Sequence, residues 1–96
     1  MVIVMNRIVV AEGREQDFEN NFKERDRAVD LMPGFIDMQV LRPVEGRTYV
    51  VMTRWKSRED FKHWIESEAF ISAHRKASPG LVENRPTLEI YEVFTP

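Results

Sequence analysis

The sequence predicts a single α+β domain over residues 1–96, in which strands and helical regions follow the order β-α-β-β-α-β. Runs rich in β-branched and aromatic residues at 2–10 and 48–55 are typical of strands. Apolar residues recur at helical spacing between residues 14 and 32 and again between 58 and 74. A further strand-forming segment follows each helical region. This order is that of the ferredoxin-like fold, an antiparallel four-stranded sheet with both helices on one face.

The first half of the chain supplies two strands and one helix. The strand at 2–10 is followed by a helix from residue 14 to about residue 32, with acidic residues in its first turn, where the helix dipole favours them. A Pro-Gly pair at 33–34 ends this helix. The second strand runs from residue 35 to about residue 42, and Gly46 in the hairpin connection that follows is available for a positive φ.

The second half begins with the clearest strand, residues 48–55. Ser57 and Asp60 then resemble a capping box, with Asp in place of the usual Glu, so a helix is expected to start there. Its pattern is interrupted around residues 66–68, which predicts two helical pieces with a kink between them. The final strand covers residues 87–94.

Composition excludes several classes of protein. The chain is 43% hydrophobic and 31% charged, which is typical of a globular domain, and its net charge of −2 disfavours binding to nucleic acid or to an anionic membrane. The absence of cysteine excludes a disulfide framework, a thiolate nucleophile and a zinc ribbon. The apolar start at residues 1–5 is too short for a signal peptide, and no stretch is long enough to span a bilayer. We therefore expect a cytoplasmic protein.

The strands carry apolar residues in both alternating registers, so both faces of the sheet need cover. Helices supply cover on one face only. We therefore expect a second copy to pack sheet against sheet, which gives a homodimeric α+β barrel. In the first strand the two registers are Ile3, Met5 and Val9 against Val2, Val4, Ile8 and Val10.

Common catalytic signatures such as GxSxG, HExxH or a glycine-rich phosphate loop are absent. Asn6 is the first candidate site residue, because it lies in mid-strand among valines and isoleucines, where Asn is disfavoured. A buried amide without hydrogen-bond partners costs about 1–3 kcal/mol. Asn6 is therefore either a satisfied structural residue near a bulge or part of a site, and spacing leaves both open.

Trp64 and His74 share the second helical region. They lie ten residues apart, so on a straight helix their directions diverge by about 80°. A kink between them would aim both at one pocket; otherwise Trp64 is a core anchor and His74 a surface imidazole. His63 is nearly in line with His74, and periodicity does not choose between the two histidines.

Arg25 interrupts the apolar face of the first predicted helix, three residues after Phe22 and four before Val29. A guanidinium beside an apolar pocket suits a carboxylate ligand. The alternative is an arginine that extends its charge from the edge of the apolar face into water. Arg27 is a second, weaker candidate.

Taken together, these residues resemble the IsdG-like heme-degrading monooxygenases of the antibiotic-biosynthesis monooxygenase superfamily, over nearly the whole chain. Short pieces of the resemblance occur across the superfamily and identify mainly the fold, whereas the set of Asn, Trp and His is more specific and points to heme. The resembling segments are Asn6-Arg7, Pro33-Gly34-Phe35, Trp55-Lys56-Ser57, Phe61-Lys62-His63-Trp64 and Phe70-Ile71-Ser72-Ala73-His74.

The resemblance implies a working triad of Asn6, Trp64 and His74, with His74 as the axial ligand of the heme iron. Asn6 would donate a hydrogen bond on the distal side, Trp64 would press on the porphyrin, and Arg25 is the expected partner of a heme propionate. The implied protein is a homodimer with one heme site per subunit. Heme would be both cofactor and substrate, and O2 with electrons from an unidentified reductase or small-molecule reductant would open the ring and release iron.

Two other functions remain open from the sequence. One is a cofactor-free quinol or polyketide-type monooxygenase on the same barrel, in which His74 is not a metal ligand. The other is a non-catalytic dimeric module that stores or passes heme or senses stress.

Overall fold

The computed structural model describes residues 1–25, 27–75, 80–83 and 85–95, without the side chains of His74 and Arg75. The helices and strands are β1 (Val2–Val9), α1 (Glu15–Lys23), the 3-10 helix η1 (Ala28–Leu31), β2 (Phe35–Leu41), β3 (Thr48–Trp55), α2 (Arg58–Ile65), α3 (Glu68–Arg75) and β4 (Thr87–Glu92). In this part of the chain no helix has the length and apolar character needed to cross a membrane.

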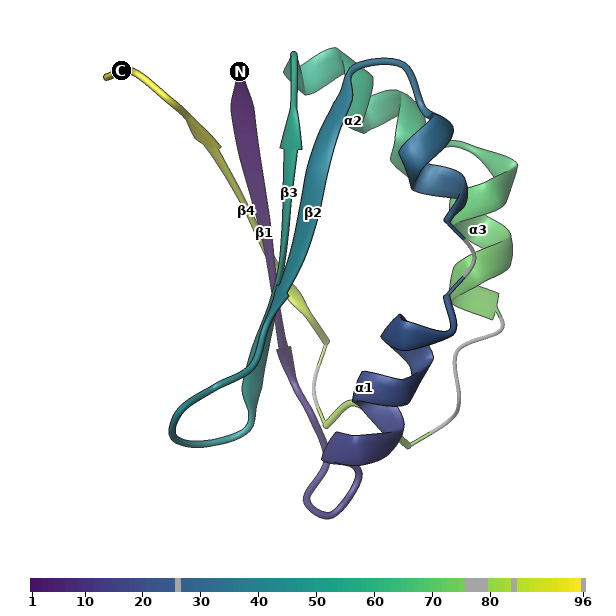
Figure 1. Cartoon of the computed structure of the whole chain (residues 1–96), viewed down its shortest axis with the longest axis vertical. Helices are drawn as coiled ribbons and strands as arrows, with labels where there is room; N and C mark the ends of the chain where they lie inside the picture. Colours follow the sequence, from purple (N-terminus) through teal and green to yellow (C-terminus); the bar gives the residue numbers. More distant parts are fainter. Residues whose placement is uncertain (26, 76–79, 84, 96) are drawn as a thin grey trace.

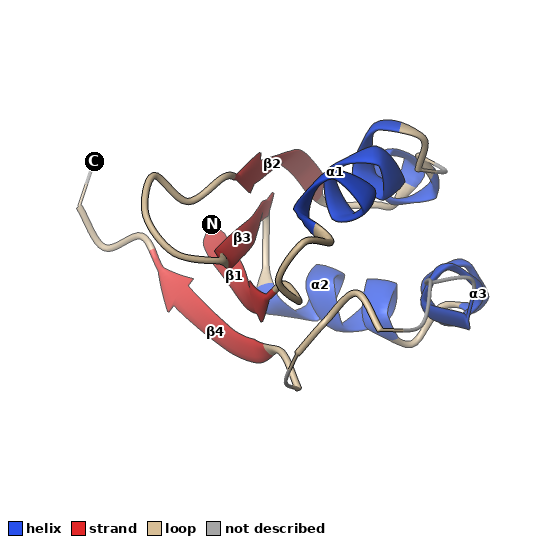
Figure 2. Cartoon of the chain, turned by 90° about the horizontal axis from the view of Figure 1, so that it is seen from below, coloured by secondary structure: helices blue, strands red, loops and turns tan. Residues whose placement is uncertain are grey.

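The four strands form one antiparallel sheet in the order β2-β3-β1-β4. All helices lie on the same face of this sheet, and the other face is left open (Figures 1 and 2). The predicted β-α-β-β-α-β order and the ferredoxin-like α+β fold are therefore confirmed. The 3-10 helix η1 and the division of the second helical region are additions to the simple plan.

The prediction of one continuous helix from residue 14 to about residue 32 is wrong. Helix α1 ends at Lys23, and η1 begins only at Ala28. No apolar side chain lies between Phe22 and Ala28, so a helix continued through this stretch would have had no apolar face to bury. Arg25 consequently lies in the connection between α1 and η1, not on a helix face.

The interruption of the second helical region is confirmed, and serine hydroxyls mark the start of both pieces. The Ser57 Oγ accepts a hydrogen bond from the Asp60 backbone N–H (3.2 Å) and donates one to Asp60 Oδ2 (2.9 Å). The Ser67 Oγ accepts from the Phe70 N–H (3.2 Å) and donates to the carbonyl of Trp64 (2.6 Å). Ser67 therefore caps α3 and binds the Trp64 carbonyl at the end of α2 through both its hydroxyl and its backbone N–H (3.0 Å), which fixes the kink.

Two glycines have a clear structural role. Gly46 adopts a φ of 82° in the β2–β3 connection, as predicted. Gly34 adopts a φ of 81°, and a Cβ at this position would overlap the Asp60 carboxylate, so only glycine allows the start of β2 to approach α2 this closely. The last strand is shorter than predicted. It ends at Glu92, and Phe94 is 93% exposed.

The buried core consists of two separate clusters on the helix-covered face. The first cluster contains Val2, Val4, Val29, Trp55 and Phe61, with Met32, Phe35, Met38, Trp64 and Ile65 packed against it. The second cluster contains Ile8, Val10, Phe18 and Tyr49, with Phe22, Val40 and Val51 packed against it. Helix α2 and η1 thus contribute to the first cluster, and α1 contributes to the second.

A polar network fastens α1 to the sheet beside the second cluster. Tyr49 on β3 donates a hydrogen bond to Glu19 Oε2 (2.6 Å), and the Arg42 Nε donates to the same oxygen (2.9 Å). These donors stabilise the ionised carboxylate, Arg42 more than Tyr49, and lower the pKa of Glu19 from 4.5 to about 2. Glu19 therefore contributes stability as an anion.

We predict that Glu19→Gln destabilises the fold in a pH-dependent way. Because the folded-state pKa is lowered, the contribution of Glu19 is complete above pH 4.5 and is lost as the pH falls toward about 2. Chemical unfolding at a series of pH values should show a gap between wild type and variant at pH 7 that closes over this range. Glu12→Gln, at an exposed carboxylate, is the control. A gap of constant size would contradict the prediction.

Candidate functional site

The two core clusters meet at Asn6 on the central strand. Side chains alternate across a strand, so Asn6 lies on the helix-covered face in one row with Val4 and Ile8. Val4 belongs to the first cluster and Ile8 to the second, while Asn6 belongs to neither. Asn6, the polar residue that interrupts the apolar pattern of the strand, thus lies between residues of the two core clusters.

The side chain of Asn6 is half-buried in apolar surroundings. Its direct neighbours across the sheet are Val51 on β3 and Leu88 on β4. Within the described residues, its amide makes no hydrogen bond, and the pairing of β1 with both neighbouring strands runs through Asn6 without a bulge. The structural alternative of a satisfied Asn beside a bulge therefore has no support. The Asn6 amide is therefore available to form a hydrogen bond with a polar atom of a ligand.

Trp64 lies in the last turn of α2 and is half-buried against the first cluster. Its ring meets that of Phe70 edge to face, with centroids 5.5 Å apart and an interplanar angle of 79°. Because Ser67 bonds both the Trp64 carbonyl and the Phe70 N–H, the kink holds these two rings together. Trp64 is thus partly a core residue, with the rest of its indole uncovered.

The two candidate axial ligands, His63 and His74, lie on different helices. His63 on α2 is exposed. His74 belongs to the last turn of α3, and its side chain lies outside the described part of the chain. The backbone of α3 packs against α2 and η1 (Figure 1). The choice of His74 over His63 therefore stays a prediction.

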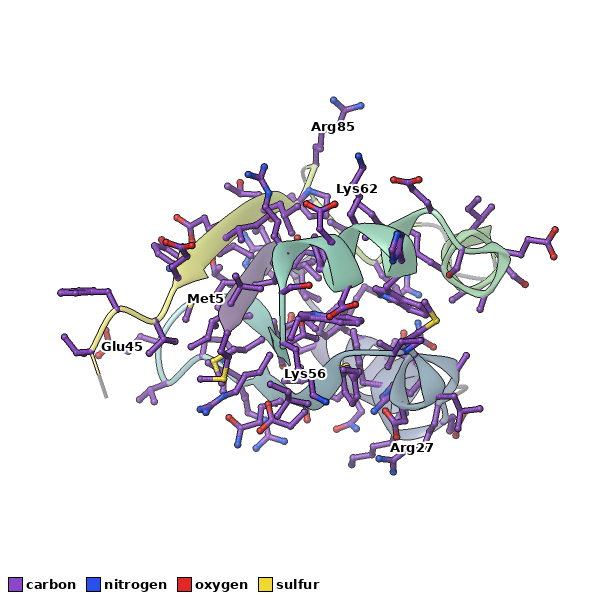
Figure 3. All side chains as sticks on the ribbon, turned by 90° about the horizontal axis from the view of Figure 1, so that it is seen from above. Met5, Arg27, Glu45, Lys56, Lys62 and Arg85 are labelled. Atoms are coloured by element: carbon purple, nitrogen blue, oxygen red, sulfur yellow. The ribbon has the colours of Figure 1, made fainter. Side chains whose placement is uncertain are left out.

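Arg25 is three-quarters buried, with a side chain 23% exposed, although it lies outside any helix. Among the described residues, its charged partner is Asp30 on η1, at 3.7 Å between Nη2 and Oδ1, which is too long for a hydrogen bond. Arg27, the weaker candidate, is 75% exposed and donates from Nε to Asp30 Oδ2 at 2.6 Å. Figure 3 shows Arg27 at the surface. Within the described part of the chain, the Arg25 guanidinium thus makes no hydrogen bond and lies in a sheltered position.

The sequence analysis missed two neighbours of these candidates. Leu88 is 50% exposed beside Asn6, and nothing but the register of β4 against β1 shows that they share a face. Asp30 had no signal either, because its approach to Arg25 depends on the path of the chain between α1 and η1. Among the described residues, no group of His, Asp or Glu side chains is placed to hold a metal ion.

Among the described residues, the candidates offer one unpaired amide on the apolar face of the sheet, a half-buried indole and a sheltered guanidinium. Groups of these kinds suit a large, flat, apolar ligand that carries carboxylates, because aliphatic and aromatic side chains would contact its faces and an arginine would bind its acid groups. A porphyrin with propionate side chains has these properties. The residues present therefore fit heme.

Comparison with known proteins agrees with this chemistry. The antibiotic biosynthesis monooxygenase family matches residues 1–76. The chain is 41% identical over 81 residues to a mycobilin-producing heme oxygenase of Mycobacterium tuberculosis, covering 81% of this chain and 76% of that protein. It is 33% identical over 98 residues to a heme-degrading monooxygenase of Halalkalibacterium halodurans, covering 97% and 82%.

Among solved structures, the chain superposes on the heme-degrader MhuD of Mycobacterium tuberculosis, whose structure holds two hemes in its active site. The TM-score is 0.85 at 32% identity, over 100% of this chain and 98% of that one. Similarity in sequence and in structure thus extends over the strands and helices that surround Asn6. The chain therefore belongs to the antibiotic biosynthesis monooxygenase family, as an IsdG-like member of it.

Proposed function

We propose that this protein degrades heme, using O2 and electrons from an external donor to open the porphyrin ring and release iron. The observation that carries the proposal is the half-buried Asn6 amide, which is unpaired among the described residues and lies on the apolar, helix-covered face between residues of the two core clusters. Apolar side chains alone would suit many ligands, but an amide donor among them suits a ligand that presents a polar atom at its centre. The names of the relatives described above support the same substrate.

Binding relies on apolar contact and on charge. Leu88 and Ile90 of β4 share the helix-covered face with Asn6 and are 50% and 37% exposed, so they offer uncovered apolar surface. Trp64 offers the uncovered part of its indole. Arg25 provides a guanidinium for a propionate. His74 provides the imidazole that we propose as axial ligand; an ordinary His is mostly neutral at pH 7 and hence able to coordinate iron.

Bound heme supplies both the iron that activates oxygen and the ring that is opened. The protein contributes position and shape. The Asn6 amide, which is unpaired among the described residues, would donate a hydrogen bond to a polar atom of the ligand and favour one orientation of that atom. Trp64 has two side-chain torsions and a large face, and its contact with Phe70 restrains it further, so it acts as a stiff wall against the macrocycle.

We also propose that the working protein is a homodimer in which two copies pack sheet against sheet. The open face of the sheet carries apolar side chains. Met5 points away from the helices (Figure 3), and Leu41 and Tyr91 on the same face are 42% and 47% exposed. On the same face, the Arg54 Nε is buried and makes no hydrogen bond within the described chain; Asp37 Oδ1 lies 3.5 Å away. A second copy would cover this surface.

The dimer is tested by sedimentation at micromolar concentration, where we expect twice the chain mass of 11.4 kDa. Met52→Asp places a charge at the centre of the open face and should shift the protein toward monomer. Asp17→Asn, far from this face, is the control. A folded wild-type monomer would contradict the proposed barrel.

Titration with hemin, followed by reductant in air and mass analysis of the product, tests the function itself. The wild type should give a shifted Soret band and an opened tetrapyrrole. His74→Ala should lose axial ligation and degradation, whereas His63→Ala should behave as wild type. A Soret band that survives in His74→Ala and is lost in His63→Ala would reverse the assignment. No Soret shift in the wild type favours a cofactor-free oxygenase, and a shift without ring opening favours a binding module.

We predict that Asn6→Ala separates turnover from stability. The amide has no hydrogen-bond partner to lose among the described residues, so thermal unfolding should shift little. Hemin should still bind, because the apolar contacts remain, but ring opening should slow by tenfold or more, equivalent to about 1.4 kcal/mol of activation free energy. Loss of hemin binding in the folded variant would show that Asn6 shapes the pocket instead.

Trp64→Ala should lower both the stability of the fold and the ring-opening activity, and the two effects can be measured separately. Removal of a fully buried Trp costs about 3–5 kcal/mol, and Trp64 is only half-buried, so we expect a smaller loss in unfolding free energy. Hemin ligation should persist, while most ring-opening activity is lost. Trp64→Phe, which keeps a rigid ring beside Phe70, should lie between. A folded, hemin-loaded Trp64→Ala that opens the ring at the wild-type rate would exclude a role for this wall.

A further inference from the structure

Three charged side chains gather at the connection between α1 and η1. Arg25 and Arg27 lie on either side of one carboxylate, that of Asp30. Arg25 is 23% exposed and Asp30 is 27% exposed, whereas Arg27 is 75% exposed. The inner arginine is therefore sheltered, the outer one is in water, and Asp30 lies between them.

Asp30 is held firmly in this position. Its Oδ2 accepts a hydrogen bond from the Arg27 Nε at 2.6 Å, and its backbone N–H donates to the Arg27 carbonyl at 3.0 Å. Its helix η1 packs against both β2 and α3. The second carboxylate oxygen, Oδ1, makes no hydrogen bond within the described residues and faces Arg25 at 3.7 Å.

The Arg25 guanidinium, by contrast, makes no hydrogen bond to those residues; only the Arg25 backbone N–H is bonded, to the Phe22 carbonyl at 3.5 Å. A guanidinium has five N–H donors, and burying its charge is costly unless an anion lies near. An arginine on an irregular segment would otherwise extend into water, as Arg27 does. Among the described residues, Asp30 is the anion beside Arg25, and at 3.7 Å it accepts no hydrogen bond from the guanidinium.

We propose that Asp30, fixed by Arg27, is a positioning residue that holds the Arg25 guanidinium in place for a carboxylate of the substrate. This role rests on the proposed function, because the carboxylate is taken to be a heme propionate. Asp30 does not touch the substrate. It keeps the Arg25 side chain sheltered and leaves the guanidinium donors available. The long Arg25 side chain is therefore already ordered before the substrate binds.

The test compares hemin with hemin dimethyl ester, in which both propionates are neutral. In the wild type, the free acid should bind more tightly than the ester, and Arg25→Ala should abolish this preference. Asp30→Asn should weaken hemin binding by about fivefold, since a charge-assisted bond loses its geometry, and leave ester binding unchanged. Asp30→Glu should restore part of the preference. In the Arg25→Ala background, Asp30→Asn should have no further effect.

The matched control is Asp17→Asn, which removes a similar i,i+3 pair, Arg14–Asp17 at 2.7 Å, from the exposed start of α1. Thermal unfolding of each variant shows whether a change in binding reflects loss of structure. Equal weakening of hemin and ester in Asp30→Asn would mean a purely structural role and overturn the proposal. Tighter hemin binding in that variant would overturn it as well, because Asp30 would then be a competitor for Arg25. A wild type that binds no hemin would instead refute the proposed function, and this role with it.

Discussion

The alternation of side chains along β1 governs the architecture of this protein. Val2, Val4, Ile8 and Val10 form a buried row on the helix-covered face, and Asn6 stands in the middle of that row. Val2 and Val4 belong to the first core cluster, Ile8 and Val10 belong to the second, and Asn6 belongs to neither. One polar residue thus interrupts the apolar row at the place where the chemistry is proposed.

Both helical regions of the chain are interrupted, the first between α1 and η1 and the second between α2 and α3. Phe18 packs in the second cluster and Val29 in the first, and they do not share one continuous helix, because α1 ends at Lys23 and η1 begins at Ala28. The second helical region breaks at Ser67, whose hydroxyl bonds both pieces. Each break is also where a candidate binding residue lies, Arg25 at the first and Trp64 at the second. Irregular segments here position side chains that a straight helix would have directed elsewhere.

The open face of the sheet combines apolar side chains with charged pairs. Met5 and Met52 lie opposite each other near its centre, and charged pairs flank them, Arg7 with Glu89 at 2.6 Å and Arg54 with Asp37 at 3.5 Å. In the proposed dimer, the apolar area would favour association with a second copy, while the charges on the same face would limit how that copy is aligned. The face thus carries both the attraction and the restriction that a specific dimer needs.

The sequence by itself determined the order of strands and helices, the break at residues 66–68, the serine cap and the positive φ at Gly46, because these follow from local spacing and turn chemistry. It also singled out Asn6, since a polar residue in an apolar strand is visible without coordinates. Tertiary structure alone decided that α1 stops at Lys23, since that end depends on which cluster each apolar residue joins. The same holds for Leu88 beside Asn6 and Asp30 beside Arg25: strand register and the fold of a connection bring together residues whose spacing in the chain carries no such information.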